Sequence, residues 1–126
     1  MSRSVLPENR IHAAIRDKIS QHQRAVVDEV QAMVARHPVV VVGMGINPFP
    51  RRARAALDRA GIGYQYLEYG SYLGQWRKRN ALKLWTGWPT FPMVFVQGML
   101  VGGASDLQRL LDSGELQAML AAPRPD

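Results

Sequence analysis

The chain has 126 residues, a net charge of +6 at pH 7 and no cysteine. A chain of this length forms one globular domain with a core that needs no disulfide or metal. The missing cysteine excludes a thiolate nucleophile, a disulfide framework and a self-ligated iron–sulfur cluster. The N-terminal residues lack an apolar core of signal-peptide length, and no apolar run could span a bilayer. We therefore expect a cytoplasmic soluble protein without a membrane partner.

The first 36 residues predict helices. Isoleucine recurs at every fourth position over residues 11–19, and apolar residues over 25–34 recur close to the helical period of 3.6. Pro38 ends the second helical pattern. Nothing over residues 21–23 decides whether the two patterns form one helix or two. The isoleucine stripe needs burial against the chain or another copy, so a homo-oligomer through these helices stays open.

The pattern changes after Pro38 and predicts a strand, a helix and a second strand. Residues Val39–Val42 form a β-branched run bounded by proline and glycine, which is typical of a strand buried on both faces. A glycine-containing turn leads to a helix whose apolar face runs from Ala53 to Ala60, with Gly61 at its C-terminus. Residues 62–68 predict the second strand. Because crossover connections are right-handed, we expect the two strands to be parallel.

The second half predicts a helix, a hairpin and two short helices. Two prolines between Trp88 and Pro92 exclude a helix there. Gln97 and Gly98 stand between two apolar runs, which predicts a β-hairpin. The expected elements are a helix over 73–85, strands over 93–96 and 99–101, a helix over 106–112 with Ser105 as its N-cap, and a last apolar turn over 116–120 after Gly114.

Three blocks of this half carry a family resemblance: Trp88–Pro92, Gly102-Gly103 and Asp112–Leu116. In letters, order and spacing they resemble the monothiol members of the glutaredoxin family, within the thioredoxin-fold superfamily. The resemblance covers about residues 37–120. It implies an α/β, thioredoxin-like (glutaredoxin) fold, with a mixed four-stranded sheet flanked by helices. We expect an N-terminal helical extension over 1–36, a glutaredoxin-like domain over 37–122 and a flexible tail over 123–126.

The chain departs from this family at the nucleophile. Glutaredoxins carry Cys-Pro-Tyr-Cys or Cys-Gly-Phe-Ser where this sequence has Asn47-Pro48-Phe49-Pro50. The resemblance thus puts Asn47 at the nucleophile position and Pro50 at the resolving position. An amide cannot replace a thiolate, so we expect no catalytic residue, no thiol–disulfide exchange and no shared iron–sulfur cluster. Asn47 instead fits a helix N-cap, and Pro50 fits the first helical turn.

The resemblance also implies a glutathione groove, with no other cofactor required. Its candidate ligand-binding residues are Phe49, Arg79, Thr90, Phe91, Pro92, Gly103, Ala104 and Ser105. The segment Thr90–Pro92 would bind the cysteinyl part through backbone groups, with Pro92 as a cis-proline. The segment Gly103–Ser105 would offer helix N-terminal N–H groups to the γ-glutamyl carboxylate, and Arg79 would face the glycyl carboxylate. Ser105 replaces a usual acidic residue and Met44 replaces a lysine, which weakens the groove.

Two functions of different classes follow. The first is a cysteine-free binding or regulatory module that uses the inherited groove for glutathione or a protein partner. The second is reuse of the fold for an anionic ligand or nucleic acid, through basic helix faces over Arg51–Arg54 and at Arg77, Lys78, Arg79 and Lys83. Two solvated helix faces explain the same charges. The nearby tryptophans are more typical of packing than of base stacking, and the histidine spacings match no metal motif.

Overall fold

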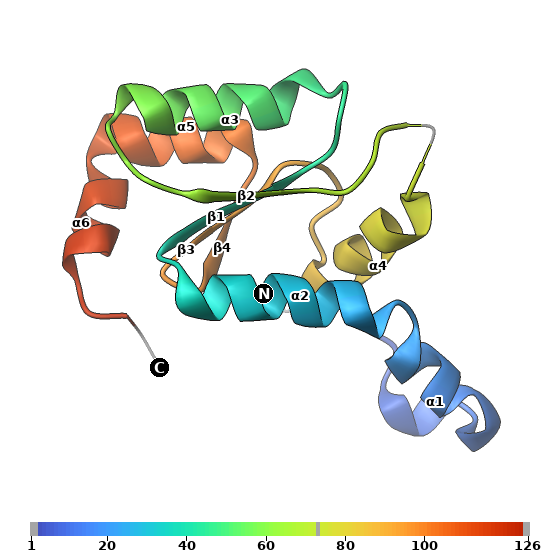
Figure 1. Cartoon of the computed structure of the whole chain (residues 1–126). Coiled ribbons are helices and arrows are strands. Elements are labelled where there is room, and N and C mark those ends of the chain that lie inside the picture. Colours follow the sequence, from blue (N-terminus) through green and yellow to red (C-terminus); the bar gives the residue numbers. More distant parts are fainter. Residues whose placement is uncertain (1–2, 73, 125–126) are drawn as a thin grey trace.

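The computed structural model describes residues 3–72 and 74–124 and contains a four-stranded sheet between two helical layers (Figure 1). The elements in chain order are η1 (Glu8–Arg10), α1 (Ala13–Gln21), α2 (Arg24–Arg36), β1 (Val39–Gly43), α3 (Pro48–Arg59), β2 (Gln65–Glu68), α4 (Trp76–Thr86), β3 (Met93–Val96), β4 (Met99–Gly102), α5 (Ala104–Ser113) and α6 (Glu115–Ala121). The strand order is β2-β1-β3-β4. Strand β2 is parallel to β1, whereas β3 and β4 are antiparallel to their neighbours. The predicted mixed sheet flanked by helices is confirmed.

The four valines of β1 connect the two halves of the core. Val39 and Val41 pack with α3, α5 and α6 on one face of the sheet, and Val40 and Val42 pack with α2 and α4 on the other. Figure 1 shows these two layers on either side of the sheet. Successive side chains of a strand point to opposite faces, so an unbroken valine run fits a central strand covered on both sides. All five residues of β1 are buried.

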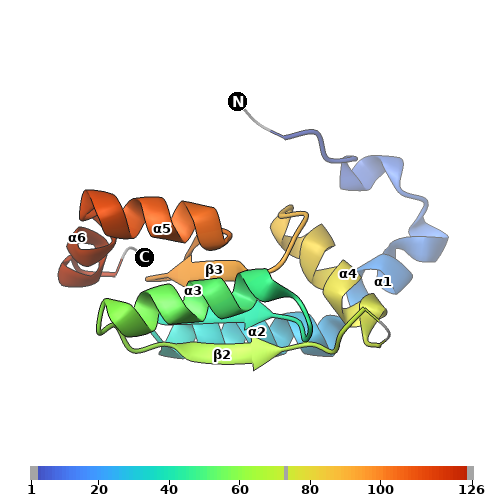
Figure 2. The same cartoon turned by 90° about the horizontal axis from the view of Figure 1, so that it is seen from above.

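Helices α1 and α2 are separate, which settles the join that the sequence left undecided. Gln23 adopts a left-handed conformation (φ 48°) and ends the helical path between them. Helix α2 buries Val26 and Val30 in the core beneath β1, whereas α1 buries none of its residues. Figure 2 shows α1 beyond the end of the sheet. Helix α2, which the sequence analysis places in the N-terminal extension, therefore shares a core with the strands that follow it.

Several element ends differ from the sequence expectation. Strand β2 begins at Gln65 rather than at residue 62, and α4 begins at Trp76. Leu73, the expected start of that helix, lies outside the described residues. The hairpin is confirmed, and its turn places Gln97 and Gly98 at positive φ (52° and 82°), as a tight two-residue turn requires.

The N-cap of α5 is Gly103, so the assignment of Ser105 to that position is wrong. The Oδ2 atom of Asp106 accepts a hydrogen bond of 2.9 Å from the Gly103 N–H. A carboxylate at the third helical position reaches back to the N-cap in this way, and it also favours the positive end of the helix dipole. The helix can therefore begin two residues earlier than a serine cap would allow.

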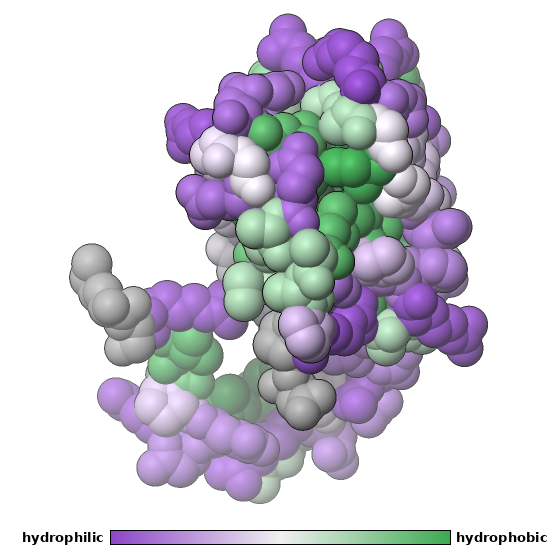
Figure 3. Space-filling view, turned by 90° about the vertical axis from the view of Figure 1, so that its left-hand side faces the viewer, coloured by the Kyte–Doolittle hydropathy of each residue, from purple (hydrophilic) through white to green (hydrophobic). Residues whose placement is uncertain are grey.

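Part of the C-terminal tail is held in place. The Arg124 guanidinium donates to the backbone carbonyls of Val34, Ala35 and His37 at 2.9–3.0 Å, where α2 ends. These carbonyls have no partner within the helix, and a cation there complements the helix dipole. Within the tail expected over 123–126, Arg124 thus contacts the end of α2, and residues 125–126 lie outside the described part. Figure 3 views this side of the molecule, where apolar residues form a strip between polar ones.

No helix in the described residues is both long and apolar enough to cross a membrane.

Candidate functional site

Asn47 caps α3 and also joins it to a distant loop. Its Oδ1 atom accepts a hydrogen bond of 2.9 Å from the Phe49 N–H, which confirms the predicted N-cap. Its Nδ2 atom donates to the Phe91 carbonyl oxygen at 3.4 Å. Pro50 is buried in the first turn of α3, where a missing N–H removes no bond within the helix. The side chain at the expected nucleophile position therefore holds α3 to the loop before β3.

A pocket of about 280 Å³ lies between this loop and the start of α5. It is lined by Phe49, Trp88, Thr90, Phe91, Pro92, Gly103, Ala104, Ser105 and Asp106. The Phe91–Pro92 peptide bond is cis, as predicted. The fold thus brings together every candidate ligand-binding residue except Arg79. The first amides of α5 have no acceptor within the helix, so this wall favours an anion.

Asp106 belongs to this pocket, although the sequence analysis did not assign it. Its carboxylate accepts from the Gly103 N–H and lies 3.8 Å from Arg109 Nη1. Sequence reasoning looked for an acidic group only at position 105, where the family usually carries one. The structure supplies a carboxylate one residue later, on the wall of the same pocket. A ligand ammonium could pair with it.

Arg79 is separated from the other candidates. Its side chain is buried, with 7% of the residue exposed, and Nη1 donates to the carbonyls of Tyr69, at 2.9 Å, and of Gly74. Its expected place on the polar face of α4 is therefore wrong. The loop before α4 turns through Gly70 and Gln75 at positive φ, and its inward carbonyls need a donor. Arg79 supplies that donor, and it lines neither pocket beside Phe49.

Met44 and Lys83 differ in their position relative to the Phe91–Pro92 loop. Met44 is 7% exposed and belongs to the core cluster beneath α2 and α4, so it does not face the groove. Lys83 of α4 places its Nζ atom 5.8 Å from the centre of the Phe91 ring. The sequence analysis had assigned Lys83 only to a basic helix face. Its position gives the Phe91–Pro92 loop a neighbouring positive charge.

A second pocket, of about 290 Å³, lies on the other side of Phe49 between α3 and α5. Its lining residues are Phe49, Arg52, Ala55, Arg59, Ala104, Ser105 and Gln108. The Cζ atom of Arg52 lies 5.1 Å from the centre of the Phe49 ring. Neither Arg52 nor Arg59 forms an ion pair with an acidic residue in the described part of the chain. This pocket is consequently basic and open to an anion.

The basic residues do not converge as one surface. Arg52 and Lys83 approach the Asn47 region from opposite sides, through their contacts with Phe49 and Phe91. Arg54 instead stacks on Tyr66, with its Cζ atom 4.1 Å from the ring centre. Helices α3 and α4, which carry the two basic sets, cover opposite faces of the sheet.

Tyr66 supports the start of α3 as a neutral phenol. Burial raises the pKa of Tyr66 to about 12, and its hydroxyl donates a 2.9 Å hydrogen bond to Glu68. A Cβ atom added at Gly43 would lie 2.7 Å from that hydroxyl and 2.8 Å from the Pro50 Cβ, so glycine permits this close approach. A phenol with this pKa stays protonated at neutral pH and acts here through packing.

We expect Asn47→Ala to lower the free energy of unfolding by about 1–2 kcal/mol, because it removes the helix cap and the bond to the Phe91 carbonyl. Asn47→Asp keeps a capping oxygen but loses the donor, so its loss should be smaller. Urea unfolding of the three proteins measures both differences. If Asn47→Ala and the parent chain had the same free energy of unfolding, the Asn47 amide would not stabilise the contact between α3 and the loop before β3.

Comparison with known proteins agrees with this geometry. A glutaredoxin family model matches residues 48–101, from the start of α3 to β4. A glutaredoxin-like protein of Dictyostelium discoideum is 41% identical over 98 residues, covering 78% of this chain and 80% of the relative. Glutaredoxin 4 of Haemophilus influenzae is 29% identical over 100 residues, covering 75% of this chain and 91% of the relative.

Among solved structures, a buckwheat glutaredoxin–glutathione complex superposes with a TM-score of 0.71 at 27% identity, covering 80% of this chain and 92% of the other. The fold thus agrees with sequence similarity that extends over most of the relatives' length. This sequence has no cysteine, and Asn47 stands at the start of α3. This chain belongs to the glutaredoxin family and is a member without cysteine.

Proposed function

We propose that this protein is a binding module without thiol–disulfide chemistry, which takes glutathione weakly in the groove beside Pro92. One observation carries the proposal. The pocket walls formed by Phe91–Pro92 and by the start of α5 remain together, although the amide of Asn47 stands where the thiol is expected. A module of this kind would bind glutathione, or a partner protein that carries a similar segment, without reacting with it.

The wall at α5 supports binding of a carboxylate. The N–H groups of Ala104 and Ser105 lie in the first turn of a ten-residue helix, where they have no acceptor within the helix. Such a terminus attracts anions, by about 0.3–1 kcal/mol at an exposed site. Asp106 adds a carboxylate on the same wall, so a ligand that bears a carboxylate beside an ammonium fits both charges.

Three features reduce the expected affinity. The Asn47 amide occupies one lone pair of the Phe91 carbonyl, Met44 is buried in the core, and Arg79 is engaged with two backbone carbonyls. Lys83 is the cation that approaches the loop. Loss of one charge-assisted bond costs about 1.5–3 kcal/mol, which corresponds to roughly a ten- to hundredfold weaker binding constant.

Backbone amide NMR with reduced glutathione tests this proposal. We expect saturable shifts of the Phe91, Gly103 and Ser105 amides at millimolar ligand. Ala104→Glu should abolish them, because its carboxylate would lie near the ligand's carboxylate while remaining compatible with the first turn of a helix. Met99→Glu adds the same charge on β4, 54% exposed and outside the pocket, and serves as the matched control. Absence of shifts in the parent protein would overturn the glutathione part of the proposal.

The pocket between α3 and α5 favours a second candidate function, namely binding of an anionic ligand by Arg52 and Arg59. Inorganic phosphate is the simplest probe. Shifts at Arg52, Arg59 and Gln108 that weaken steeply with added sodium chloride would support it, since salt screens exposed charges. Shifts confined to Ala104 and Ser105 would instead assign the anion to the groove beside Pro92.

A further inference from the structure

Large apolar side chains are exposed where α1 approaches α4. Ile15 and Ile19 of α1 are 44% and 54% exposed, and Leu84 of α4 is 69% exposed. Helix α1 buries none of its nine residues, so its isoleucine stripe remains uncovered within the described chain. Contiguous exposed apolar surface is typical of an interaction site.

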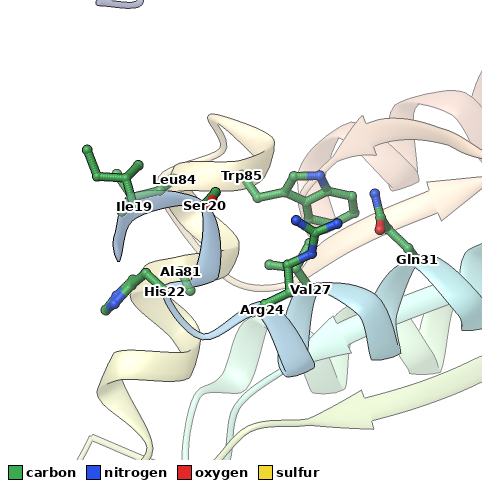
Figure 4. Close-up of a pocket in the computed structure, with 9 residues that line it drawn as sticks. All are labelled: Ile19, Ser20, His22, Arg24, Val27, Gln31, Ala81, Leu84 and Trp85. Atoms are coloured by element: carbon green, nitrogen blue, oxygen red, sulfur yellow. The ribbon is translucent and has the colours of Figure 1, made fainter. Parts of the chain in front are cut away.

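Ile19 and Leu84 border the seam between α2 and α4. A pocket of about 410 Å³ is lined there by Ile19, Ser20, His22, Arg24, Val27, Gln31, Ala81, Leu84 and Trp85. Figure 4 shows Ile19 and Leu84 at one end of the pocket and Trp85 with Gln31 at the other. The α4 residues Ala81, Leu84 and Trp85 follow the spacing of a single helix face. The pocket is thus a largely apolar trough between α4 on one side and the end of α1 with α2 on the other, with polar groups of α1 and α2 at its edge.

The same seam continues into a basic region. A smaller pocket, of about 220 Å³, is lined by Gln23, Gln75, Trp76, Arg77 and Lys78. Gln23 directly precedes Arg24 of the apolar pocket, and Trp76–Lys78 form the first turn of the helix that carries Leu84. Helix α4 contains four cations and no acidic residue. We call the two pockets together the α2–α4 groove.

We propose that the α2–α4 groove binds an amphipathic helix of a partner protein, with an apolar face flanked by carboxylates. The apolar face would fill the trough around Ala81 and Trp85, and the carboxylates would meet Arg77 and Lys78. Trp76 and Leu84 are eight residues apart, which spans about 12 Å or two helical turns. Apolar side chains at positions i, i+3 or i+4, and i+7 of a partner helix cover that length.

Charge complementarity selects this partner over a second copy of the chain. The chain carries +6 overall, and α4 has no carboxylate with which to neutralise the α4 of another copy. Like charges brought together at an interface oppose association, whereas opposite charges accelerate it. This inference extends the proposed binding role to a surface that contains neither Asn47 nor the Pro92 loop. Failure of glutathione binding would therefore not contradict helix binding by the α2–α4 groove.

A synthetic peptide of about 18 residues tests this surface, with leucine at i, i+3, i+4 and i+7 and glutamate on its flanks. Titration should shift the amides of residues 23–31 and 76–85. We expect Leu84→Glu, and separately Arg77→Glu with Lys78→Glu, to raise the peptide Kd at least about tenfold. Leu84 is already exposed, so the folded core should tolerate the change. Met99→Glu adds the same charge elsewhere and should leave the Kd unchanged.

Three results would overturn the inference. The first is no shift with the acidic peptide, and the second is equal binding of a peptide with lysine in place of glutamate or with its leucines scrambled. The third is a dimer in sedimentation velocity that Leu84→Glu converts to a monomer, which would assign the groove to a second copy. The glutathione titration of each variant, read at Phe91 and Gly103, separately reports the state of the other groove.

Discussion

Asn47→Cys is expected to give this protein thiol–disulfide reactivity that the parent chain lacks. The new thiol would stand at the N-terminus of α3, beside the exposed arginines Arg51 and Arg52. A free cysteine has a pKa of about 8.5, and a helix N-terminus lowers it to roughly 3.5–7.5. Much of the thiol would therefore be thiolate at pH 7. The adjoining pocket at Phe91–Pro92 would hold glutathione near the sulfur.

The reaction to be measured is exchange with glutathione disulfide. The thiolate attacks one sulfur of the disulfide, the S–S bond breaks, and a mixed disulfide forms while one glutathione leaves as a thiolate. Mass spectrometry detects the glutathione adduct, and its rate against pH reports the pKa of the thiol. We expect the parent protein to form no adduct, because it contains no cysteine.

A cysteine placed elsewhere on the chain shows whether the reactivity depends on the surroundings of residue 47 or only on the presence of a thiol. Met99→Cys places a thiol on the exposed side of β4, away from a helix N-terminus and from the pocket. At pH 7 we expect its adduct to form at least about tenfold more slowly than that of Asn47→Cys, since a smaller fraction is thiolate. Equal rates would contradict a preserved reactive environment at residue 47. Asn47→Ser keeps a capping hydroxyl without a thiol and should form no adduct.

The parts of the fold that the sequence predicted correctly depend on local pattern. A run of four valines between proline and glycine can only be covered on both faces if it lies in the centre of a sheet. The Gln97–Gly98 turn and the end of α3 at Gly61 were predictable because both need positive φ, which glycine adopts more readily than other residues. The cap at Asn47 likewise needs only an amide and the next helical turn.

The local sequence pattern could not predict whether the side chains of the site point into the core or toward the groove. Arg79 stands among exposed cations in the sequence, yet the carbonyls of the loop before α4 draw it inward. Met44 occupies a family lysine position, but an apolar side chain there gains more from the core beneath α2. Both outcomes depend on contacts between segments distant in the sequence. The cap of α5 was missed because the N-cap is Gly103, which has no side chain, and the capping carboxylate comes from Asp106 at the third helical position.

Gly102→Ala is expected to lower the free energy of unfolding by about 3 kcal/mol or more, since strain and a clash combine there. Gly102 has φ of +118°, a conformation that L-residues with a side chain rarely adopt. A Cβ atom at this position would lie 2.5 Å from the Oδ2 atom of Asp106 and 2.9 Å from its Cβ. Asp106 cannot rotate away freely, because its carboxylate caps α5 through the Gly103 N–H.

Gly114→Ala provides the control for backbone strain alone. Gly114 has φ of +80°, and a Cβ atom added there meets no other atom within 4 Å. Its loss should be about 1–2 kcal/mol, the cost of the left-handed conformation for alanine. Urea unfolding of both variants measures how much the clash with Asp106 and the larger φ of Gly102 add to the cost of a left-handed alanine, and equal losses would contradict the clash. Because Asp106 and the first amides of α5 line the groove beside Pro92, Gly102→Ala should also weaken the glutathione-dependent shifts at Gly103 and Ser105.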